Sequence, residues 1–227
     1  MIPCYINTFN RLTTTKELCQ QVALLDGVKP IIIDNASNYE PLLDWYESCD
    51  FEVIHLRENL GHHAPWKSGV IKQDNAERYI VTDCDLSLDG IPKDVIEVLK
   101  EPFGWYNKNK IIKSGLALRI DDLPPWQKDV INWEKRWWSN QVGHDPRFYY
   151  ALIDTTFAMY EKKTPENIAM RVINCRCVRL AGEYQARHMP WYLDCNNLND
   201  EELFYFRNAN SSNSWKINGR KLSTGNK

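Results

Sequence analysis

Two aspartates separated by a single residue form the segment of this sequence best suited to chemistry. Asp83-Cys84-Asp85 follows directly after the apolar run at residues 79–82. Carboxylates at the end of a strand can hold a hard divalent cation, and such a cation can bridge diphosphate oxygens and neutralise a leaving group. The same spacing also occurs in ordinary turns and helix caps. The assignment therefore depends on what the rest of the chain places beside this pair.

Three earlier segments also end in polar residues after short apolar runs. Residues 3–8 predict a strand that ends at Thr8, residues 31–33 one that delivers Asp34, and residues 51–56 one that is followed by Asn59. In open α/β sheets, ligands bind outside the carboxyl ends of parallel strands. We therefore expect Thr8, Asp34, Asn59 and Asp83 to face one crevice.

Helical patterns separate these strands and favour a βαβ arrangement with a largely parallel sheet. Residues 14–17 match a capping box, apolar residues follow at helical spacing, and Gly27 supplies a stop. In the second half, residues 110–120, 149–160 and 170–180 predict longer strands, and residues 125–139 form an amphipathic stretch. Residues 202–206 predict a last helix, and 208–227 a loosely ordered tail.

Bulk properties point to specific small-molecule chemistry rather than to nucleic acid or an anionic membrane. The 227 residues suit one domain, and 28 basic and 30 acidic residues give a net charge of −2. The seven cysteines are scattered, with no Cys-x-x-Cys spacing, which favours reduced thiols. No apolar run approaches the ~20 residues that span a bilayer. We therefore expect a soluble cytoplasmic protein, in the host cytoplasm if the source is viral, with no transmembrane segment.

Four polar segments in a characteristic order carry a family resemblance. They are residues 6–11, Asp34-Asn35-Ala36-Ser37, Asn59-Leu60-Gly61 and Asp83-Cys84-Asp85. In this order and spacing, the first 90 residues resemble the family 2-like glycosyltransferases of the GT-A fold. Residues 114–124, 153–158 and 186–192 look like segments of small transferases from bacterial polysaccharide and large-DNA-virus glycosylation systems.

The resemblance implies a single-domain GT-A α/β fold, a Rossmann-like nucleotide-diphospho-sugar transferase fold with a mostly parallel central sheet. The domain would span residues 1–207, with a nucleotide-sugar half at 1–100, an acceptor half at 101–207 and the tail at 208–227. It also implies that Thr8 and Arg11 contact the nucleotide and that Asp34 hydrogen-bonds the base, usually uracil in this family.

The same resemblance divides the work of the acidic pair. Asp85 would hold the metal, Mn²⁺ or Mg²⁺, while Asp83 would lie near the ribose and sugar and contribute to the metal shell. His188 is the histidine best placed to be a further ligand, and Mn²⁺ accepts nitrogen more readily than Mg²⁺. A histidine satisfied by local hydrogen bonds is the alternative. Lys67 could supply a cation beside the diphosphate, and a helix N-terminus near Ala64 would add backbone donors. Asn59 is also expected to bind the donor.

An inverting transfer needs a base that takes the proton from the acceptor hydroxyl. Asp154 is the first choice, because it lies among apolar and hydroxyl residues where burial could raise its pKa. Asp122 and Asp121 are rivals, although an Asp-Asp-Leu-Pro turn is also a common exit from a strand, and Glu183 is a more distant one. A retaining enzyme would need no such base.

The predicted function is metal-dependent transfer of a sugar from a nucleotide-sugar donor, a UDP-sugar, to a glycan or glycoconjugate acceptor. A sugar-phosphate nucleotidyltransferase is one alternative, but it would carry a glycine-rich loop after the first strand, and residues 7–12 contain no glycine. A non-catalytic nucleotide- or glycan-binding module on the same scaffold is the other.

Overall fold

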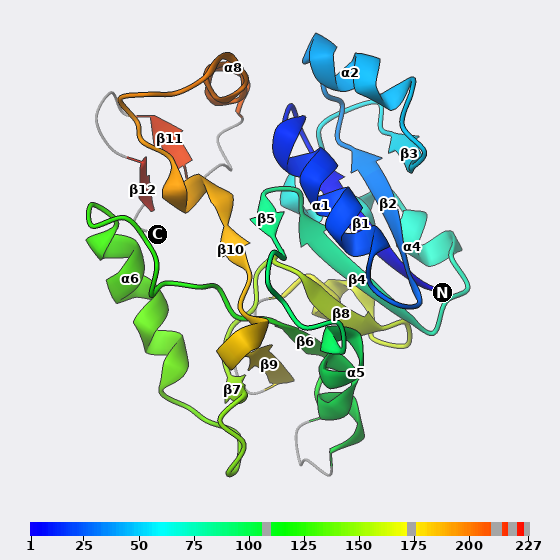
Figure 1. The fold of residues 1–227 in the computed structure, drawn as a ribbon. Coiled ribbons are helices and arrows are strands. Elements are labelled where there is room, and N and C mark those ends of the chain that lie inside the picture. Colours follow the sequence, from blue (N-terminus) through cyan, green and yellow to red (C-terminus); the bar gives the residue numbers. More distant parts are fainter. Residues whose placement is uncertain (106–109, 172–175, 210–214, 218–221, 225–227) are drawn as a thin grey trace.

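The computed structural model describes residues 1–105, 110–171, 176–209, 215–217 and 222–224. Within them, eight strands form one central sheet in the order β3-β2-β1-β4-β8-β6-β9-β7 (Figure 1). These strands are β1 (Ile2–Thr8), β2 (Val28–Asp34), β3 (Glu52–His55), β4 (Arg78–Asp83), β6 (Lys113–Leu116), β7 (Phe148–Tyr150), β8 (Ala158–Glu161) and β9 (Cys177–Leu180).

The sheet is mostly parallel. β1 pairs in parallel with β2 and β4, β2 pairs in parallel with β3, and β6 pairs in parallel with β9. β8 runs antiparallel to both β4 and β6, and β7 runs antiparallel to β9. The predicted α/β class with a mostly parallel sheet is therefore confirmed, and the antiparallel strands come from the second half of the chain.

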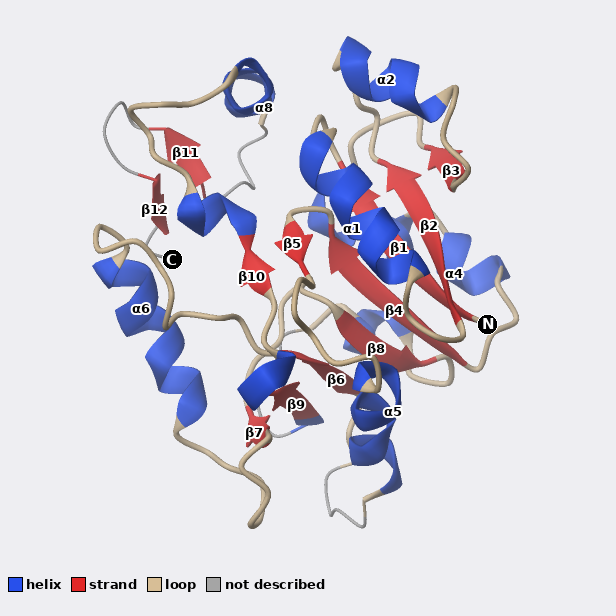
Figure 2. Cartoon of the chain, viewed as in Figure 1, coloured by secondary structure: helices blue, strands red, loops and turns tan. Residues whose placement is uncertain are grey.

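Helices cover both faces of this sheet (Figure 2). One core packs α1 (Thr13–Ala23), α2 (Glu40–Tyr46) and α5 (Val95–Lys100) against side chains such as Ile32. The other packs α3 (Ala64–Lys67), α4 (Val70–Gln73) and α7 (Glu166–Ala169) against Ile31 and Ile33. Successive residues of β2 thus enter opposite cores, which explains why Ile31, Ile32 and Ile33 form an unbroken apolar run.

Smaller described elements lie outside the central sheet. They are β5 (Leu86–Ser87), β10 (Arg187–His188), α6 (Lys128–Lys135), α8 (Asp200–Asn208) and the two-stranded pair of β11 (Trp215–Ile217) and β12 (Leu222–Thr224). β5 pairs with β10 although they are about a hundred residues apart in the chain (Figure 1). This pairing brings a late segment of the chain to the end of β4.

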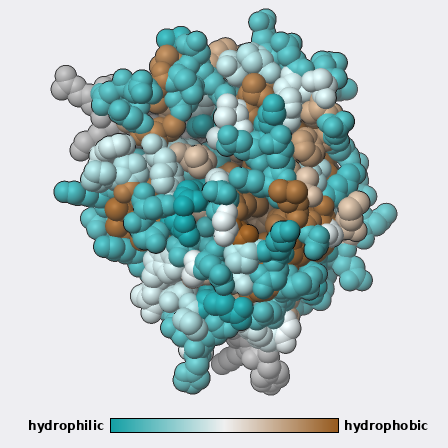
Figure 3. All heavy atoms as spheres, viewed as in Figure 1, coloured by the Kyte–Doolittle hydropathy of each residue, from teal (hydrophilic) through white to brown (hydrophobic). Residues whose placement is uncertain are grey.

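The face of the molecule seen in Figure 3 is mostly hydrophilic, with a hydrophobic area near its middle. No helix in the described ranges is long and apolar enough to cross a membrane.

The strands predicted in the first half are confirmed, but the predicted capping box is wrong. Helix α1 starts at Thr13, and its N-cap residue Leu12 makes no side-chain cap hydrogen bond. The hydroxyl of Thr15 instead donates to the carbonyl of Arg11, inside the helix's first turn. The predicted stop at Gly27 is wrong as well: the helix ends at Ala23 with Leu24 as its C-cap, and Gly27, with φ of 73°, lies in the turn that leads into β2.

The second half differs more from the expectations. The strand expected at 110–120 is confined to β6, and the one expected at 149–160 is two short strands, β7 and β8, with a loop between them. Of the strand expected at 170–180, only β9 forms; Met170 is the C-cap of α7, and residues 172–175 lie outside the described residues.

The amphipathic stretch at 125–139 does contain helix α6. The last helix, α8, includes residues 202–206, and the tail expected at 208–227 lies largely outside the described residues.

The close approach of β6 and β8 gives a stability prediction. A Cβ atom added at Gly115 would lie 2.7 Å from the Cβ of Ala158 and 2.9 Å from the carbonyl oxygen of Phe157. Gly115→Ala should therefore lower the free energy of unfolding by about 1–3 kcal/mol, measured by urea denaturation. Gly104→Ala is the matched control, because a Cβ there meets nothing within 4 Å. Equal stability of the two variants would contradict this packing.

Candidate functional site

Asp83 is the last residue of β4 and is fixed by the loop that precedes β8. Its backbone N–H donates to the carbonyl of Thr155 at 2.8 Å, and the Thr155 hydroxyl donates to Asp83 Oδ2 at 2.6 Å. Burial, together with the neighbouring carboxylate of Asp85, raises the pKa of Asp83 well above its usual range. Two carboxyl groups thus lie close together at a poorly hydrated strand end.

The β5–β10 pairing places a histidine opposite Asp85. His188 is in register with Leu86, and the N–H of Met189 donates to the carbonyl of Asp85 at 2.8 Å. His188 Nε2 lies 3.5 Å from Asp85 Oδ1. Burial alone would raise the pKa of Asp85, but His188 and Arg11 outweigh it and lower the pKa to about 2. Asp85 is therefore ionised under ordinary conditions.

The chemistry of this pair fits a divalent cation. Asp85 Oδ1 is buried with His188 Nε2 as its described neighbour at 3.5 Å, and the side chains of Asp85 and His188 are 13% and 12% exposed. The described ranges contain no preformed group of three or more metal-binding side chains. Hard cations are often held by one or two carboxylates while substrate phosphates and water supply the other ligands. The pair thus suits an ion that is completed by a bound diphosphate.

Arg11 supplies positive charge on the other side of Asp85, but it is not open to solvent. The residue is 5% exposed, and its guanidinium carbon lies 3.7 Å from the centre of the Tyr205 ring. Although burial disfavours its charge, Tyr205 and Asp85 keep the pKa of Arg11 above its usual value. Arg11 is therefore held as a buried cation between α8 and the acidic loop.

Helix α8 is attached to the loops that follow β1 and β2. The hydroxyl of Thr13 donates to Glu201 at 2.7 Å, and the rings of Tyr39 and Phe204 are 4.9 Å apart. The helix starts with a capping box in which the side chain of Asn199 accepts from the N–H of Glu202. A segment of the predicted acceptor half thus covers the nucleotide half near Arg11.

The two predicted nucleotide contacts at the ends of β1 and β2 are buried. Thr8 is fully buried and is in register with Asp34. Asp34 Oδ1 accepts from the N–H of Ser37 at 3.3 Å and from the hydroxyl of Tyr46 at 3.4 Å, and Oδ2 lies 3.2 Å from Nδ1 of His55. Asp34 therefore already has three partners in the protein itself.

Two asparagines hold the loops at the strand ends in place. Asn10 Oδ1 accepts from the N–H groups of Asn38 and Tyr39 at 2.7 and 3.1 Å, and Asn10 adopts φ of 52°, which asparagine tolerates. Asn35 accepts from the N–H of Leu60 at 2.7 Å and donates to the carbonyl of Gly61 at 3.1 Å. These hydrogen bonds tie the loops that follow β1, β2 and β3 to one another.

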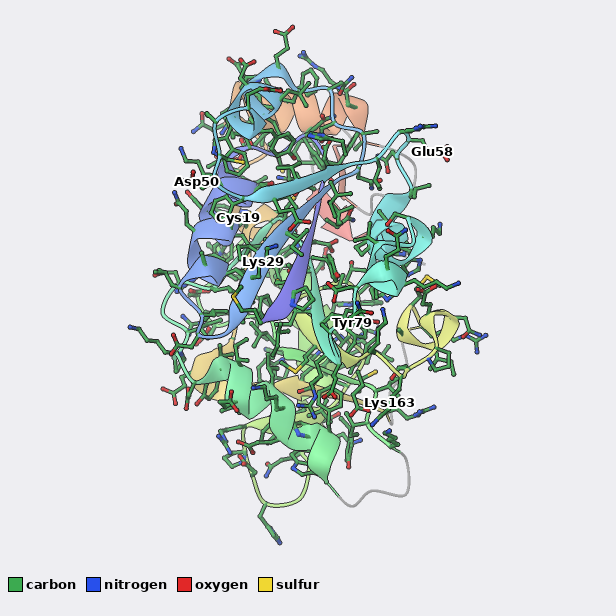
Figure 4. The ribbon with its side chains drawn as sticks, turned by 90° about the vertical axis from the view of Figure 1, so that its right-hand side faces the viewer. Cys19, Lys29, Asp50, Glu58, Tyr79 and Lys163 are labelled. Carbon is green, nitrogen blue, oxygen red and sulfur yellow. The ribbon has the colours of Figure 1, made fainter. Side chains whose placement is uncertain are left out.

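Asn59 and Lys67 lie on the loop that Asn35 holds. Asn59 Oδ1 accepts from the N–H of Gly61 at 2.9 Å, and Lys67 Nζ donates to the carbonyl of Leu60 at 3.4 Å. Helix α3 begins at Ala64, as expected, and Lys67 is exposed on it. Figure 4 shows β3 running from near Asp50 toward Glu58, so this loop lies at the carboxyl ends of the strands.

The two predicted bases have different surroundings. The burial expected for Asp154 is wrong: the residue is exposed, although it lies close enough to Asp83 to help raise the pKa of that carboxyl group. Asp122 is held by Arg187 at 2.7 Å and by the hydroxyl of Tyr192 at 2.5 Å. Burial would raise the pKa of Asp122, but these hydrogen bonds lower it. Asp122 is thus a weak base.

Most predicted site residues meet at one edge of the sheet, together with several that the sequence did not indicate. Thr8, Arg11, Asp34, Asp83, Asp85 and His188 lie at the ends of β1, β2 and β4 or on β10. No role was predicted from the sequence for Asn10, Asn35, His55, Thr155 or Tyr205. Thr155 and Tyr205 lie in segments 153–158 and 202–206, but nothing in their spacing along the chain links them to Asp83 or Arg11.

Solved structures resemble this fold at low sequence identity. S. aureus TarS 1-349, crystallised with UDP-GlcNAc, aligns over 85% of this chain and 61% of that chain, with a TM-score of 0.50 and 13% identity. A longer structure of S. aureus TarS aligns over 82% of this chain and 36% of that chain, with a TM-score of 0.50 and 12% identity. The chain has the GT-A fold. It spans 61% and 36% of the lengths of these two TarS chains. No family model matches it, and the search of curated proteins found no match.

The Thr155 hydroxyl should be required to keep the Asp83 carboxyl group in place. Thr155→Val leaves a buried carboxyl oxygen without its donor, so the free energy of unfolding should fall by about 1–3 kcal/mol in urea denaturation. Thr155→Ser keeps a hydroxyl and should retain most of the stability. If valine and serine variants are equally stable, the hydrogen bond does not have this role.

Proposed function

We propose that this chain is a metal-dependent glycosyltransferase that moves a sugar from a UDP-sugar to a glycan or glycoconjugate acceptor. The observation that carries the proposal is the largely buried, ionised Asp85 with His188 beside it at the end of β4. In the GT-A fold this edge of the sheet is where a nucleotide would lie. The sequence resemblance further suggests a cytoplasmic enzyme of the small type found in bacterial polysaccharide and large-DNA-virus glycosylation systems.

The donor would lie across the ends of β1, β2 and β4. The loops held by Asn10 and Asn35 would shape the nucleotide pocket, and Lys67 would approach the diphosphate from the Asn59 loop. The TarS structure with UDP-GlcNAc supports the choice of a UDP-sugar by analogy of fold. Arg11 would contribute indirectly, because its buried positive charge offsets the negative charge of Asp85.

Asp85 and His188 are the proposed metal-binding residues, with Asp83 beside them. A Mn²⁺ or Mg²⁺ ion held there would neutralise diphosphate charge and stabilise the charge that develops on the leaving UDP. Asp85 stays ionised because His188 and Arg11 outweigh its burial, so it is ready to bind a cation. Thr155 keeps Asp83 from turning away from this edge.

Asp154 is the proposed base of an inverting transfer. It follows the buried Ile153 and precedes Thr155, and its exposed carboxylate can meet an acceptor that arrives from solvent. It would take the proton of the acceptor hydroxyl as that oxygen attacks the anomeric carbon from the face opposite the diphosphate. Asp122 is less suited, since Arg187 and Tyr192 occupy its oxygens.

Two alternatives predict different reactions from the same fold. A sugar-phosphate nucleotidyltransferase would use a nucleoside triphosphate and release pyrophosphate, but the loop after β1 lacks the glycines that such a loop needs to wrap phosphates. A non-catalytic module would bind a nucleotide or glycan without turnover. Incubation with UTP and sugar phosphate, and separately with UDP-sugars, distinguishes the three by the product that appears.

Removal of one carboxylate should test the metal assignment. Asp85→Asn should lower Mn²⁺-dependent hydrolysis of UDP-sugars by at least about a hundredfold, because the cation loses its charged ligand. The rate of UDP release measures this effect, and Asp89→Asn, an exposed aspartate four residues along the chain, is the matched control. Metal-dependent turnover that survives in Asp85→Asn would sink the assignment.

If Asp154 is the base, its removal should slow the transfer step without weakening the binding of the donor nucleotide. Asp154→Asn should lower kcat for transfer by about 10²–10⁴, while the Kd for UDP measured by calorimetry stays unchanged. Asp121→Asn, at another exposed aspartate, should leave both values intact. A product that retains the anomeric configuration of the donor would contradict the role of Asp154 as a base.

A further inference from the structure

Three residues in register form a row across the ends of β1, β2 and β3. Thr8 is opposite Asp34, and Asp34 is opposite His55. Thr8 is fully buried and the side chain of Asp34 is 4% exposed, whereas the side chain of His55 is 58% exposed. Of this row, only His55 can meet a ligand without rearrangement of the protein.

Asp34 is engaged in positioning this histidine. Its Oδ2 lies 3.2 Å from His55 Nδ1, and its Oδ1 accepts from Tyr46 and from the backbone of Ser37. The ring of Tyr46 also packs edge-on against the imidazole, with ring centres 5.5 Å apart. The imidazole is thus fixed by a carboxylate on one side and an aromatic ring on another.

The carboxylate also decides which ring nitrogen carries the proton. An ionised carboxylate only accepts hydrogen bonds, so the His55 nitrogen that faces it, Nδ1, must be the donor. In the neutral imidazole the other nitrogen, Nε2, is then an acceptor. The row therefore ends in His55, whose side chain is more than half exposed and whose acceptor atom is Nε2.

We propose that His55, rather than Asp34, reads the base of the donor nucleotide, and that it selects uracil. This inference rests on the proposed function. The N3–H of uracil would donate to His55 Nε2. Cytosine has a bare acceptor at N3, so two acceptors would face each other and that base would be disfavoured. Asp34 acts through His55 as a positioning residue.

Calorimetric titration with UDP and with CDP, each in the presence of Mn²⁺, tests the proposal on the intact chain. The wild-type protein should bind UDP about tenfold more tightly than CDP. His55→Ala should lose this preference, mainly through weaker binding of UDP. His144→Ala is the matched control, since His144 is an exposed histidine in the loop before β7, and it should keep the wild-type ratio.

A second variant tests the proton assignment. In Asp34→Asn, the side-chain amide can turn its NH₂ group toward Nδ1, which moves the ring proton to Nε2 and makes that atom a donor. The preference should then shift from UDP toward CDP, whereas loss of a purely structural carboxylate would weaken both nucleotides alike. An unchanged preference for UDP in Asp34→Asn would overturn the proposed positioning role.

The outcomes separate this inference from the function on which it rests. If the wild-type protein binds neither nucleotide, the proposed function fails. If the wild-type protein prefers UDP and His55→Ala prefers it to the same degree, the assignment of His55 is wrong and the proposed function stands.

Discussion

The repulsion between two adjacent carboxyl groups at a poorly hydrated strand end is the constraint on which the site depends. The pKa values of the two carboxyl groups shift in opposite directions: that of Asp83 is raised, and that of Asp85 is lowered to about 2. Thr155 donates to the first, while His188 and Arg11 offset the charge of the second. These compensating groups allow an ionised carboxylate to remain at this strand end.

The compensating groups explain why distant segments converge on one edge of the sheet. Thr155 comes from the loop that precedes antiparallel β8, His188 from the pairing of β10 with β5, and Tyr205 from α8, which lies over Arg11. The second half of the chain therefore completes the site that the parallel strands begin. Hydrogen bonds of Asn10 and Asn35 also tie the loops at this edge to one another.

Local patterns in the sequence were sufficient to predict the parallel strands of the first half and the polar residues at their carboxyl ends. The apolar runs that give β1, β2 and β4 also place Thr8, Asp34 and Asp83, because the carboxyl ends of parallel strands share an edge. The strands predicted at 110–120, 149–160 and 170–180 were too long, because the lengths of β6 to β9 depend on pairing with one another rather than on local pattern. The contact of Arg11 with Tyr205 and the exposure of Asp154 depend on tertiary packing, which spacing along one chain does not encode.

The most direct test of the account is a crystal structure with Mn²⁺ and UDP, recorded with anomalous scattering from manganese. The account predicts an anomalous peak about 2.2 Å from a carboxylate oxygen of Asp85, within reach of His188, with the diphosphate beside the ion at the end of β4. A nucleotide bound away from the ends of β1, β2 and β4, or a bound nucleotide with no manganese at Asp85, would contradict it.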